Sequence, residues 1–516
     1  MKQSKTSTIR SYAVHGLNCT SVEIEVDVAQ GLPQFIIVGL PDAAVSEARD
    51  RVRSAIKNSG FEFPMQRVTV NLAPAHIKKV GSLFDMPIAV GILAASAAIR
   101  SDIGEAIIGE CALNGNTRPI RGMLAIAAAA HRDGVPLIIP SDNAEEAALT
   151  GHADILAAET LSDVVHHLND HAALPTAYTL GCGSTAPVAR RGKGEAEEGG
   201  RLHEIIGQHA AKRACAIAAA GRHNILLAGP PGVGKSMLAR ALQSLLPPMT
   251  RDEIIEATTV HSVSPQSMPS VVNARPYRAP HHSTSTAAMV GGGAACHPGE
   301  ISLAHTGVLF LDELPEFRRD VLEALRQPLE NGTITILRAA GKATFPARCL
   351  LIAAQNPCPC GFAGLPPEMK KPCSCSDLDI RRYAKKISGP LLDRIDLKVN
   401  VPFVRPEDII SSAALDAGAS ERTNELIKKI AEARSRQLQR QRKPNADLTS
   451  REAKAQKLDA ESQQLLNDAL RQNRLSMRGY IKTIKVSRTI ADLDGESSIN
   501  KKHIAEALSF TMCSTN

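Results

Sequence analysis

Short apolar runs alternate with longer helical stretches over the first 172 residues. Runs with strand character occur at 22–26 (VEIEV), 35–39 (FIIVG), 67–72 (RVTVNL) and 136–140 (PLIIP). Between them, residues 43–59, 87–98 and 123–133 are rich in Ala and have the spacing of helices. This alternation predicts a mixed α/β domain over residues 1–172.

The pattern changes twice further along the chain. Residues 181–200 contain six Gly, charges of both signs and almost no large apolar side chain, which indicates a flexible linker within 173–200. Strand candidates then return at 224–228, 307–312 and 349–356, each leading into a turn or helix, as in a parallel sheet covered by helices. From about residue 406 the pattern is helical and strongly charged. We therefore expect a second α/β domain over 201–405 and a helical region over 406–516.

Composition narrows the class of protein. The chain has 516 residues, 43% of them apolar and 22% charged, so several globular domains are expected. Aromatic residues make up only 3%, with no Trp, which argues against a receptor built on aromatic stacking. The first residues lack the apolar core of a signal peptide, and the most apolar stretch, 86–99, is too short to span a bilayer. Most of the 11 Cys are scattered, unlike those of a secreted disulfide scaffold. These features predict a cytoplasmic protein with no membrane partner.

The most specific motif is a phosphate-binding loop after the strand candidate at 224–228. It satisfies G-x-x-x-x-G-K-[ST] with the residues Gly229, Pro230, Pro231, Gly232, Val233, Gly234, Lys235 and Ser236. Glycines let backbone N–H groups surround phosphate oxygens, and the N-terminus of the following helix adds positive potential. Lys235 would face the β- and γ-phosphates of ATP, and Ser236 would offer a hydroxyl to Mg²⁺.

Polar residues at the ends of two later strands complete this candidate site. Asp312 and Glu313 follow the apolar run 307–311, where Asp312 would join the Mg²⁺ shell and Glu313 would polarise the attacking water. Asn356 ends the next strand and would help to position that water, although an isolated Asn there is also a common turn residue. Arg394 lies between Asp393 and Asp396; it is either an arginine finger that reaches a neighbouring subunit's nucleotide or part of a local salt bridge.

The runs RPYRAPHHSTSTAAMVGGG (275–293) and PGEISLAHTGVLFLDELPEF (298–317) resemble the magnesium-chelatase-like AAA+ ATPases, and more closely the YifB/ComM group. The resemblance covers nearly the whole chain. It implies an N-terminal domain like that of Lon protease (S5-like, α+β), an AAA+ core with a parallel sheet and a C-terminal helical lid. It further implies a homo-hexameric ATPase that drives branch migration or unwinding of single-stranded or branched DNA in natural transformation and homologous recombination. On this resemblance, Asp312 and Glu313 form the Walker B motif, Asn356 is sensor 1, Arg394 is the finger and Arg478 is the sensor-2 arginine.

Two insertions follow from the same comparison. The segment 259–299 would form a loop facing a central pore. Residues 332–348 read as two β-rich halves around Gly341 and Lys342, which predicts a hairpin. Lys342 near its tip, with Arg338 close by, would contact DNA phosphates; an ordinary surface hairpin is the alternative.

The N-terminal region resembles a Lon proteolytic domain that lacks its catalytic residues. A Ser–Lys dyad needs a hydroxyl beside a desolvated amine. Leu124 occupies the position of the catalytic Lys, and only Ser82 remains as a weak candidate nucleophile, with Lys78 and Lys79 nearby in the sequence. We therefore expect a domain without protease activity, which serves assembly or DNA contact.

Four cysteines are clustered as C-x-C…C-x-C at Cys358, Cys360, Cys373 and Cys375. Four thiolates match a closed, structural zinc site, whereas C-x-C strains chelation, so a redox-sensitive or merely thiol-rich loop is the alternative. The pair His281–His282 lacks a third ligand at metal spacing and is interpreted as a structural loop feature.

Charge gives one further indication of a nucleic-acid partner. The whole chain has a net charge of +7, and residues 422–457 alone hold 11 Lys and Arg against 4 Asp and Glu. Phosphate contacts or a solvated helical face would both explain this basic stretch. Motor chemistry does not itself reveal the substrate, so a chelatase-type motor acting on a protein or metal-insertion partner, a Lon-like protease and a non-hydrolysing scaffold remain the alternatives to a DNA motor.

Overall fold

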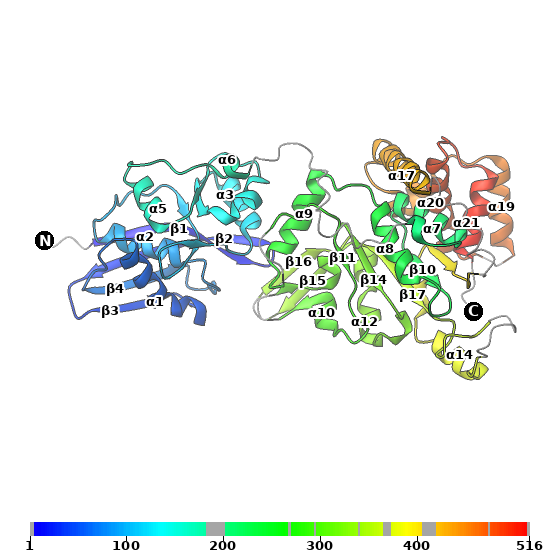
Figure 1. Cartoon of the computed structure of the whole chain (residues 1–516), viewed down its shortest axis with the longest axis horizontal. Helices are drawn as coiled ribbons and strands as arrows, with labels where there is room; N and C mark the ends of the chain where they lie inside the picture. The colour runs from blue at the N-terminus through cyan, green and yellow to red at the C-terminus, as the bar shows by residue number, and fades with distance from the viewer. Residues whose placement is uncertain are drawn as a thin grey trace.

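The computed structural model describes residues 5–181, 202–266, 270–293, 296–338, 341–364, 373–404, 419–472 and 475–512. Figure 1 shows an elongated arrangement in which the N-terminal unit lies at one end, a second α/β unit lies in the middle and the C-terminal helices lie at the far end. No helix in these ranges has both the length and the apolar character needed to cross a membrane.

The N-terminal unit is a mixed sheet with helices packed on it. Its strands lie in the order β3-β4-β2-β1-β5-β8-β9, with β1, β2 and β4 antiparallel and the remaining pairs parallel. The apolar helix α2 is buried along its whole length against this sheet. The elements are β1 (Lys5–His15), β2 (Asn18–Ala29), β3 (Gln34–Val38), α1 (Ala43–Asn58), β4 (Arg67–Ala73), α2 (Asp85–Ala95), β5 (Ala106–Ile107), β6 (Glu110–Cys111), β7 (Thr117–Arg118), α3 (Met123–Asp133), β8 (Leu137–Pro140), η1 (Ser141–Asn143), α4 (Ala144–Ala148), β9 (Ile155–Ala158), α5 (Leu161–Leu168) and α6 (Ala177–Gly181).

The middle unit is built on a parallel sheet in the order β11-β14-β17-β10-β18. Both faces of this sheet are covered, because alternate residues enter different cores: Ile225 and Leu227 pack with the helices α7 and α8, and Leu226 packs on the opposite face. The elements are η2 (Leu202–Glu204), α7 (His209–Gly221), β10 (Ile225–Ala228), α8 (Lys235–Leu245), α9 (Arg251–Ser262), β11 (Tyr277–Arg278), α10 (Thr286–Val290), β12 (Gly291–Gly292), β13 (His297–Pro298), α11 (Glu300–Leu303), β14 (Val308–Leu311), η3 (Leu314–Glu316), α12 (Arg319–Ala324), α13 (Arg326–Asn331), β15 (Thr333–Arg338), β16 (Gly341–Pro346), β17 (Leu350–Gln355), α14 (Asp377–Ala384), α15 (Gly389–Leu392) and β18 (Leu397–Asn400).

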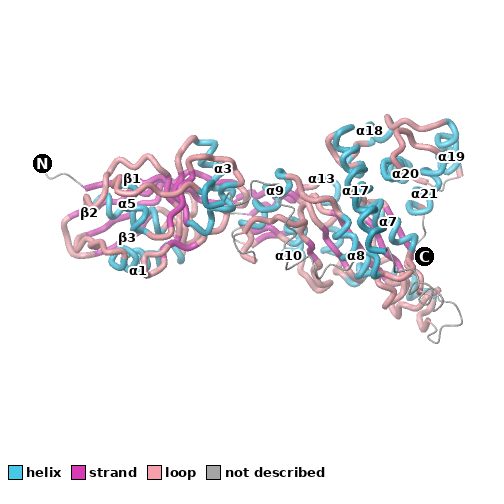
Figure 2. The backbone as a smooth tube through the Cα atoms, turned by 45° about the horizontal axis from the view of Figure 1, so that its top comes forward, coloured by secondary structure: helices cyan, strands magenta, loops and turns pink. Residues whose placement is uncertain are grey.

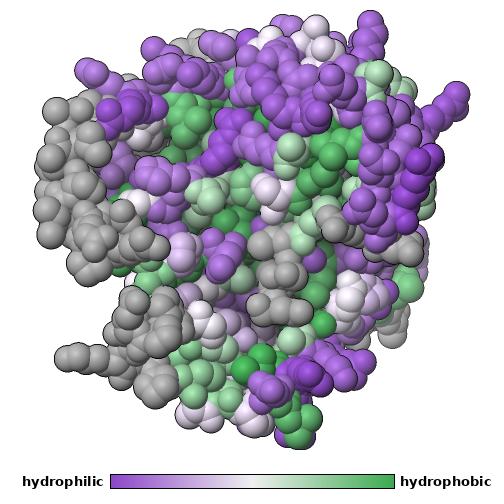
Figure 3. Space-filling view, turned by 90° about the vertical axis from the view of Figure 1, so that its right-hand side faces the viewer, coloured by the Kyte–Doolittle hydropathy of each residue, from purple (hydrophilic) through white to green (hydrophobic). Residues whose placement is uncertain are grey.

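The C-terminal region contains helices only among its described elements, and α17 and α20 pack on α7 (Figure 2). Figure 3 looks onto this end of the molecule and shows mainly hydrophilic side chains along its upper edge. The helices are α17 (Ala419–Gln441), η4 (Asn445–Asp447), α18 (Ser450–Lys454), α19 (Ala460–Arg471), α20 (Met477–Leu493) and α21 (Lys501–Thr511). The mixed α/β class with a parallel-sheet core and a C-terminal helical region is thereby confirmed.

The N-terminal unit contacts the middle unit through α9 and through the β15–β16 hairpin. The amide of Gly122 donates to the carbonyl of Ser262 at the end of α9, at 2.9 Å. In the turn between β1 and β2, a Cβ on Gly16 would lie 2.8 Å from that of Ala343 in β16, and Leu17 packs against the same core. The β15–β16 hairpin is therefore seated against the N-terminal unit.

Two features of the N-terminal unit differ from the pattern-based expectation. The longest sheet pairing uses β1, which the sequence pattern did not single out, because hydroxyl and charged side chains alternate with its apolar ones. Residues within the expected linker also fold back: Pro175 accepts a hydrogen bond from Ala157, and Ala177 is buried. The rest of that expected linker, from 182 to 200, lies outside the described residues.

Candidate nucleotide-binding site

The phosphate-binding loop joins β10 to α8, and its glycines meet distinct backbone requirements. Gly232 and Gly234 have φ of 80° and 92°, in the left-handed region, and a Cβ at either would meet no atom within 4 Å. Gly229 is needed for a different reason, since a Cβ there would lie 2.2 Å from the carbonyl oxygen of Val401. The loop therefore leaves an open, N–H-lined concavity at the start of α8, which fits a phosphate group.

Lys235 is the first residue of α8 and its side chain is buried in this loop. Its Nζ donates to the carbonyls of Gly229 and Pro230, at 2.7 and 2.8 Å, and to Oδ1 of Asn356, at 3.0 Å. Burial lowers the pKa of Lys235, while the charges of Asp312 and Glu313 oppose that shift. The predicted phosphate-loop lysine and the predicted sensor residue are thus brought together.

Asp312 and Glu313 follow β14, where the sheet places them beside the phosphate loop. The hydroxyl of Ser236 donates to Oδ2 of Asp312 at 3.0 Å, so the two predicted Mg²⁺ ligands are adjacent. Hydroxyl and carboxylate oxygens are hard donors that suit Mg²⁺. Glu313 has a left-handed φ of 50°, an unfavourable conformation for a residue with a Cβ, which turns its exposed carboxylate away from the strand direction.

His282 is a residue of this site that the sequence pattern did not identify. Its Nδ1 lies 3.5 Å from Oε2 of Glu313. Its ring centroid lies 4.0 Å from that of His281, with the two planes tilted by 36°, and Phe317 meets it edge-on. We interpreted His281–His282 as a structural loop feature, and that interpretation did not include the contact between His282 and Glu313, the carboxylate expected to activate water. No local sequence pattern links His282 to Glu313, because the two residues are thirty-one positions apart in the sequence.

Arg394 and Arg478 lie together, away from their own phosphate loop. Both line a cleft of about 780 Å³ whose described lining includes no residue of the loop, nor Asp312, Glu313 or Asn356. Arg394 forms an ion pair with Glu330 and donates to the carbonyl of Pro390 at 2.7 Å. Arg478 lies 3.7 Å from Asp393. The cleft also contains basic residues from the C-terminal helices, including Lys482 and Lys485.

The predicted hairpin is present as β15 and β16, with a register that shifts its tip. Gly341 pairs with Arg338 and Lys342 with Leu337, so Gly341 and Lys342 belong to β16 rather than to the connection between the strands; residues 339–340 lie outside the described residues. Lys342 is exposed one pair back from the turn. Arg338 belongs to β15 by its backbone, and its side chain lies outside what the structure describes. Within the segment 259–299, the structure forms β11, α10 and the β12–β13 pair.

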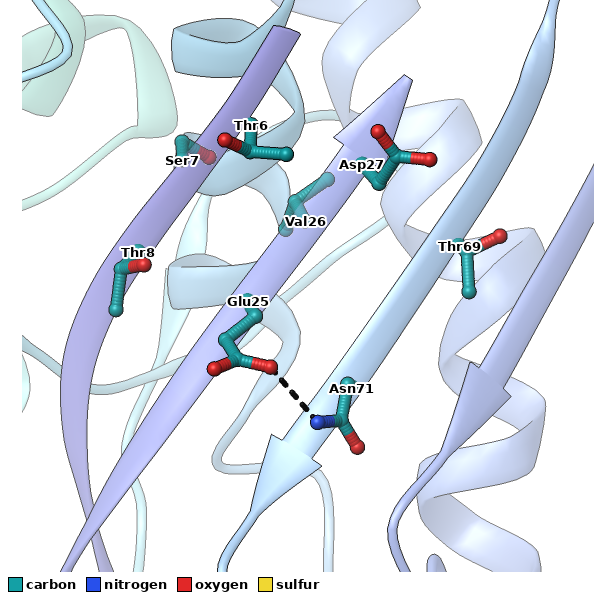
Figure 4. A pocket seen from close by; sticks show the side chains of 8 residues that line it. All are labelled: Thr6, Ser7, Thr8, Glu25, Val26, Asp27, Thr69 and Asn71. Atoms are coloured by element: carbon teal, nitrogen blue, oxygen red, sulfur yellow. Dashed lines mark hydrogen bonds between the residues drawn. The ribbon is translucent and has the colours of Figure 1, made fainter. Parts of the chain in front are cut away.

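The residues considered for a protease dyad do not pair with each other. Ser82 donates to the carboxylate of Glu110, and the buried Lys79 donates to the carbonyl of Pro74. Leu124 is buried at the start of α3, where its amide donates to Oε1 of Glu146 at 3.0 Å. Lys78 is exposed. A shallow polar groove of about 340 Å³ lies elsewhere on this unit, across β1, β2 and β4, and includes a 2.8 Å hydrogen bond from Asn71 to Glu25 (Figure 4).

The four clustered cysteines converge directly after Asn356. Their sulfur atoms all lie within 4.8 Å of one another, a grouping that could hold a metal ion. The residues between them from 365 to 372 lie outside the described residues.

Much of the basic stretch at 422–457 is used inside the molecule. Arg434 is buried and donates to the carbonyls of Ala219 and Ala220 at the end of α7, both at 2.9 Å. Burial lowers the pKa of Arg434 to about 9. Arg440 binds the buried carboxylate of Asp492 through two hydrogen bonds, at 2.9 and 2.8 Å. Part of the charge excess therefore attaches the C-terminal helices to α7 of the middle unit. This role differs from both predicted explanations, DNA phosphate contacts and a solvated helical face.

Comparisons with known proteins match nearly every part of the chain. Residues 201–409 match the family model described as magnesium chelatase, subunit ChlI; residues 24–143 match that of subunit ChlI of Mg-chelatase, and residues 420–511 match its C-terminal model. The competence protein ComM of Haemophilus influenzae is 45% identical over 97% of this chain and 96% of its own length. The protein YifB of Escherichia coli is 41% identical over 98% of this chain and 96% of its own length.

A more distant match is the magnesium-chelatase 67 kDa subunit of Heliobacterium mobile, 25% identical over 42% of this chain and 34% of its own length. The family implies an ATPase that uses ATP and Mg²⁺, and the loop, hydroxyl and carboxylate described above supply the groups to bind them. The chain belongs to the ComM/YifB family of magnesium-chelatase-like AAA+ proteins.

Proposed function

We propose that this protein is a cytoplasmic, hexameric, Mg²⁺-dependent ATPase that moves along single-stranded or branched DNA and promotes branch migration in natural transformation and homologous recombination. The observation that supports this most is the similarity to the competence protein ComM, which runs through all three units of the chain. The chelatase-type core is a motor in either case, so the proposal concerns what the motor moves.

Within one subunit, each residue of the site has a distinct task. The loop amides and Lys235 bind the phosphates. Ser236 and Asp312 would hold Mg²⁺, which would supply positive charge beside the transferred phosphoryl group. Glu313 accepts a proton from the attacking water, and Asn356 orients that water. Lys235 exchanges its contacts with the loop carbonyls for contacts with phosphate oxygens.

A neighbouring subunit supplies the missing positive charge. Arg394 lies in a cleft apart from its own phosphate loop, which supports its role as a finger that acts on the nucleotide of the next subunit, and Arg478, the sensor-2 arginine, lines the same cleft. Their acidic neighbours, Glu330 and Asp393, hold the two guanidinium groups in place. This arrangement supports a ring in which each nucleotide is completed by two subunits.

DNA contacts are assigned to the hairpin. Lys342 is exposed near its tip, and Arg338 lies on the paired strand. The N-terminal unit, in which Ser82 and Lys79 have other partners, is proposed to act without protease activity as an assembly or DNA-contacting module. Zinc is proposed as a further, non-catalytic cofactor of the cysteine cluster.

The test is the ATPase rate with and without single-stranded or branched DNA, for the wild type and for Glu313→Gln. We expect DNA to bind, with an affinity that falls as salt rises, and to stimulate hydrolysis. The Glu313→Gln protein should bind both ligands and hydrolyse almost no ATP. If DNA neither binds nor stimulates while Glu313→Gln still abolishes hydrolysis, the DNA motor is refuted and a chelatase-type motor is favoured. Peptide hydrolysis lost on Ser82→Ala would instead restore the protease alternative.

A further inference from the structure

We infer that Cys358, Cys360, Cys373 and Cys375 hold a Zn²⁺ ion that positions the phosphate-binding loop. This inference rests on the proposed role of residues 229–236 in binding ATP. It adds a structural requirement, which is that the nucleotide site depends on a metal centre outside it.

The arrangement of the sulfur atoms fits one tetrahedral ion. Zn–S bonds of about 2.3 Å in a tetrahedron separate neighbouring sulfurs by about 3.8 Å. The Sγ of Cys358 lies 3.3 Å from that of Cys360 and 3.7 Å from that of Cys373, and the last two lie 3.5 Å apart. Cys375 completes the group within 4.8 Å. These separations are far from the ~2.05 Å of a disulfide, so the cluster has the spacing of thiolates around an ion.

Backbone amides support the same reading. The amide of Ala363 donates to the sulfur of Cys358 at 3.3 Å, and that of Cys375 donates to the sulfur of Cys373 at 3.4 Å. Such outer hydrogen bonds orient ligands and stabilise the negative charge of thiolates. Four thiolates leave no open coordination position, and soft sulfur ligands select zinc over Mg²⁺, so the site is closed and structural.

The cluster is joined to the nucleotide site through Gly361. This residue has φ of 87°, and a Cβ on it would lie 2.7 Å from Cδ of Pro231 and 4.0 Å from Cγ of Asn356. The cysteine segment therefore lies directly against both the phosphate loop and the residue that holds Lys235. Cys358 is fully buried and Cys375 precedes the N-cap of α14, so an ion shared by both would fix the segment at each end.

Loss of the ion would release this support. Without the ion, only backbone contacts would hold the segment at Gly361. The phosphate-binding loop would then lose the fixed contact between Gly361 and Pro231. A loop displaced by a fraction of an ångström holds phosphate oxygens less well, because its N–H groups act only at hydrogen-bond distance. We therefore expect nucleotide affinity to depend on zinc occupancy.

The first experiment measures the metal. The full chain, purified under reducing conditions, should contain one zinc ion per chain by elemental mass spectrometry. Cys373→Ser should lose it, whereas Cys19→Ser, which changes a cysteine outside the cluster, should retain it. Wild-type protein without zinc, or zinc retained by Cys373→Ser, would overturn the metal assignment.

The second experiment separates positioning from folding. Gly361→Ala keeps all four ligands but places a methyl group against Pro231, and it should retain zinc while its affinity for fluorescent ADP falls on the order of tenfold. Gly364→Ala is the matched control, since Gly364 has φ of 75° in the same segment and a Cβ there would meet nothing within 4 Å. Both variants bear similar backbone strain, so equal affinity in the two would overturn the positioning role.

The two proposals fail in different ways. A zinc-loaded wild type that binds no nucleotide would refute the ATP site, and with it the positioning role, while the metal assignment would stand on the elemental analysis. Chelation that removes zinc and leaves nucleotide affinity unchanged would refute positioning alone.

Discussion

Glu146 lies where the N-terminal unit meets the middle unit. This carboxylate is buried beneath α3, where it accepts from the amide of Leu124 and lies near Ser262 of α9. Burial raises the pKa of Glu146 from 4.5 to about 7, against opposing hydrogen bonds from the backbone amide of Leu124 and the side chains of Ser262 and Asn143. We predict that Glu146→Gln stabilises this joint at pH 8 and has little effect near pH 5.

The sign and size follow from proton linkage. Between pH 4.5 and about 7 the folded protein holds a proton on Glu146 that the unfolded chain has released, so stability falls as pH rises through this interval. The difference between 4.5 and about 7, at ~1.4 kcal/mol per pKa unit, is worth about 3 kcal/mol at most. Gln keeps an oxygen to accept from the Leu124 amide and has no proton to lose, so this pH-dependent term disappears.

Hydrogen exchange is the appropriate assay, because a chain of several units does not unfold in one step. The opening free energy of amides in α3 and α4, corrected for intrinsic exchange, is compared at pH 5, 6.5 and 8. Wild type should lose up to about 3 kcal/mol across this range, and Glu146→Gln should lose much less. The control is Glu145→Gln, an exposed neighbour on the same helix that should follow wild type. Equal pH dependence in wild type and Glu146→Gln would refute the reasoning.

Three further predictions address the motor. Arg394→Ala should bind ADP normally and hydrolyse ATP about 10³-fold more slowly, and mixing it with Lys235→Ala protein should recover activity only if Arg394 acts on a neighbouring subunit. His282→Ala should raise DNA-free turnover without changing the KM for ATP, because it frees Glu313, whereas His281→Ala should not; equal effects would contradict this role. Arg434→Met removes the side-chain donor of the Ala219 carbonyl and leaves the Ala220 carbonyl with only Gln437. It should cost about 2 kcal/mol in the stability of the C-terminal helices, measured by hydrogen exchange, with the exposed Lys428→Met as a neutral control.

The sequence was sufficient to predict the parts of the fold whose signal is local. The strand before the phosphate loop, the loop itself and the helix at Lys235 form one continuous segment, and their glycines and apolar runs have few other interpretations. Likewise the run at 308–311 is apolar on every residue because the parallel sheet is covered on both faces.

What could not be predicted depends on contacts between distant segments. His282 meets Glu313 only because β11 and β14 are neighbours in the sheet. The charges of Arg434 and Arg440 indicated a solvated or DNA-binding face, since nothing in their local pattern shows that the carbonyls of α7 and the carboxylate of Asp492 would take them up. β1 was missed because Ser7 and Ser11 occupy two of its buried positions and interrupt the apolar face formed by Ile9 and Ala13.

The seating of the hairpin on the turn at Gly16 has a mechanical consequence. Ala343 and Phe345 lie beside that glycine, so the N-terminal unit supports β16 directly next to Lys342 rather than only at the base of the hairpin. A force applied at the tip would be carried into the sheet of the N-terminal unit rather than absorbed by bending of two isolated strands. The attachment of the N-terminal unit would then limit how far Lys342 can move relative to the middle unit.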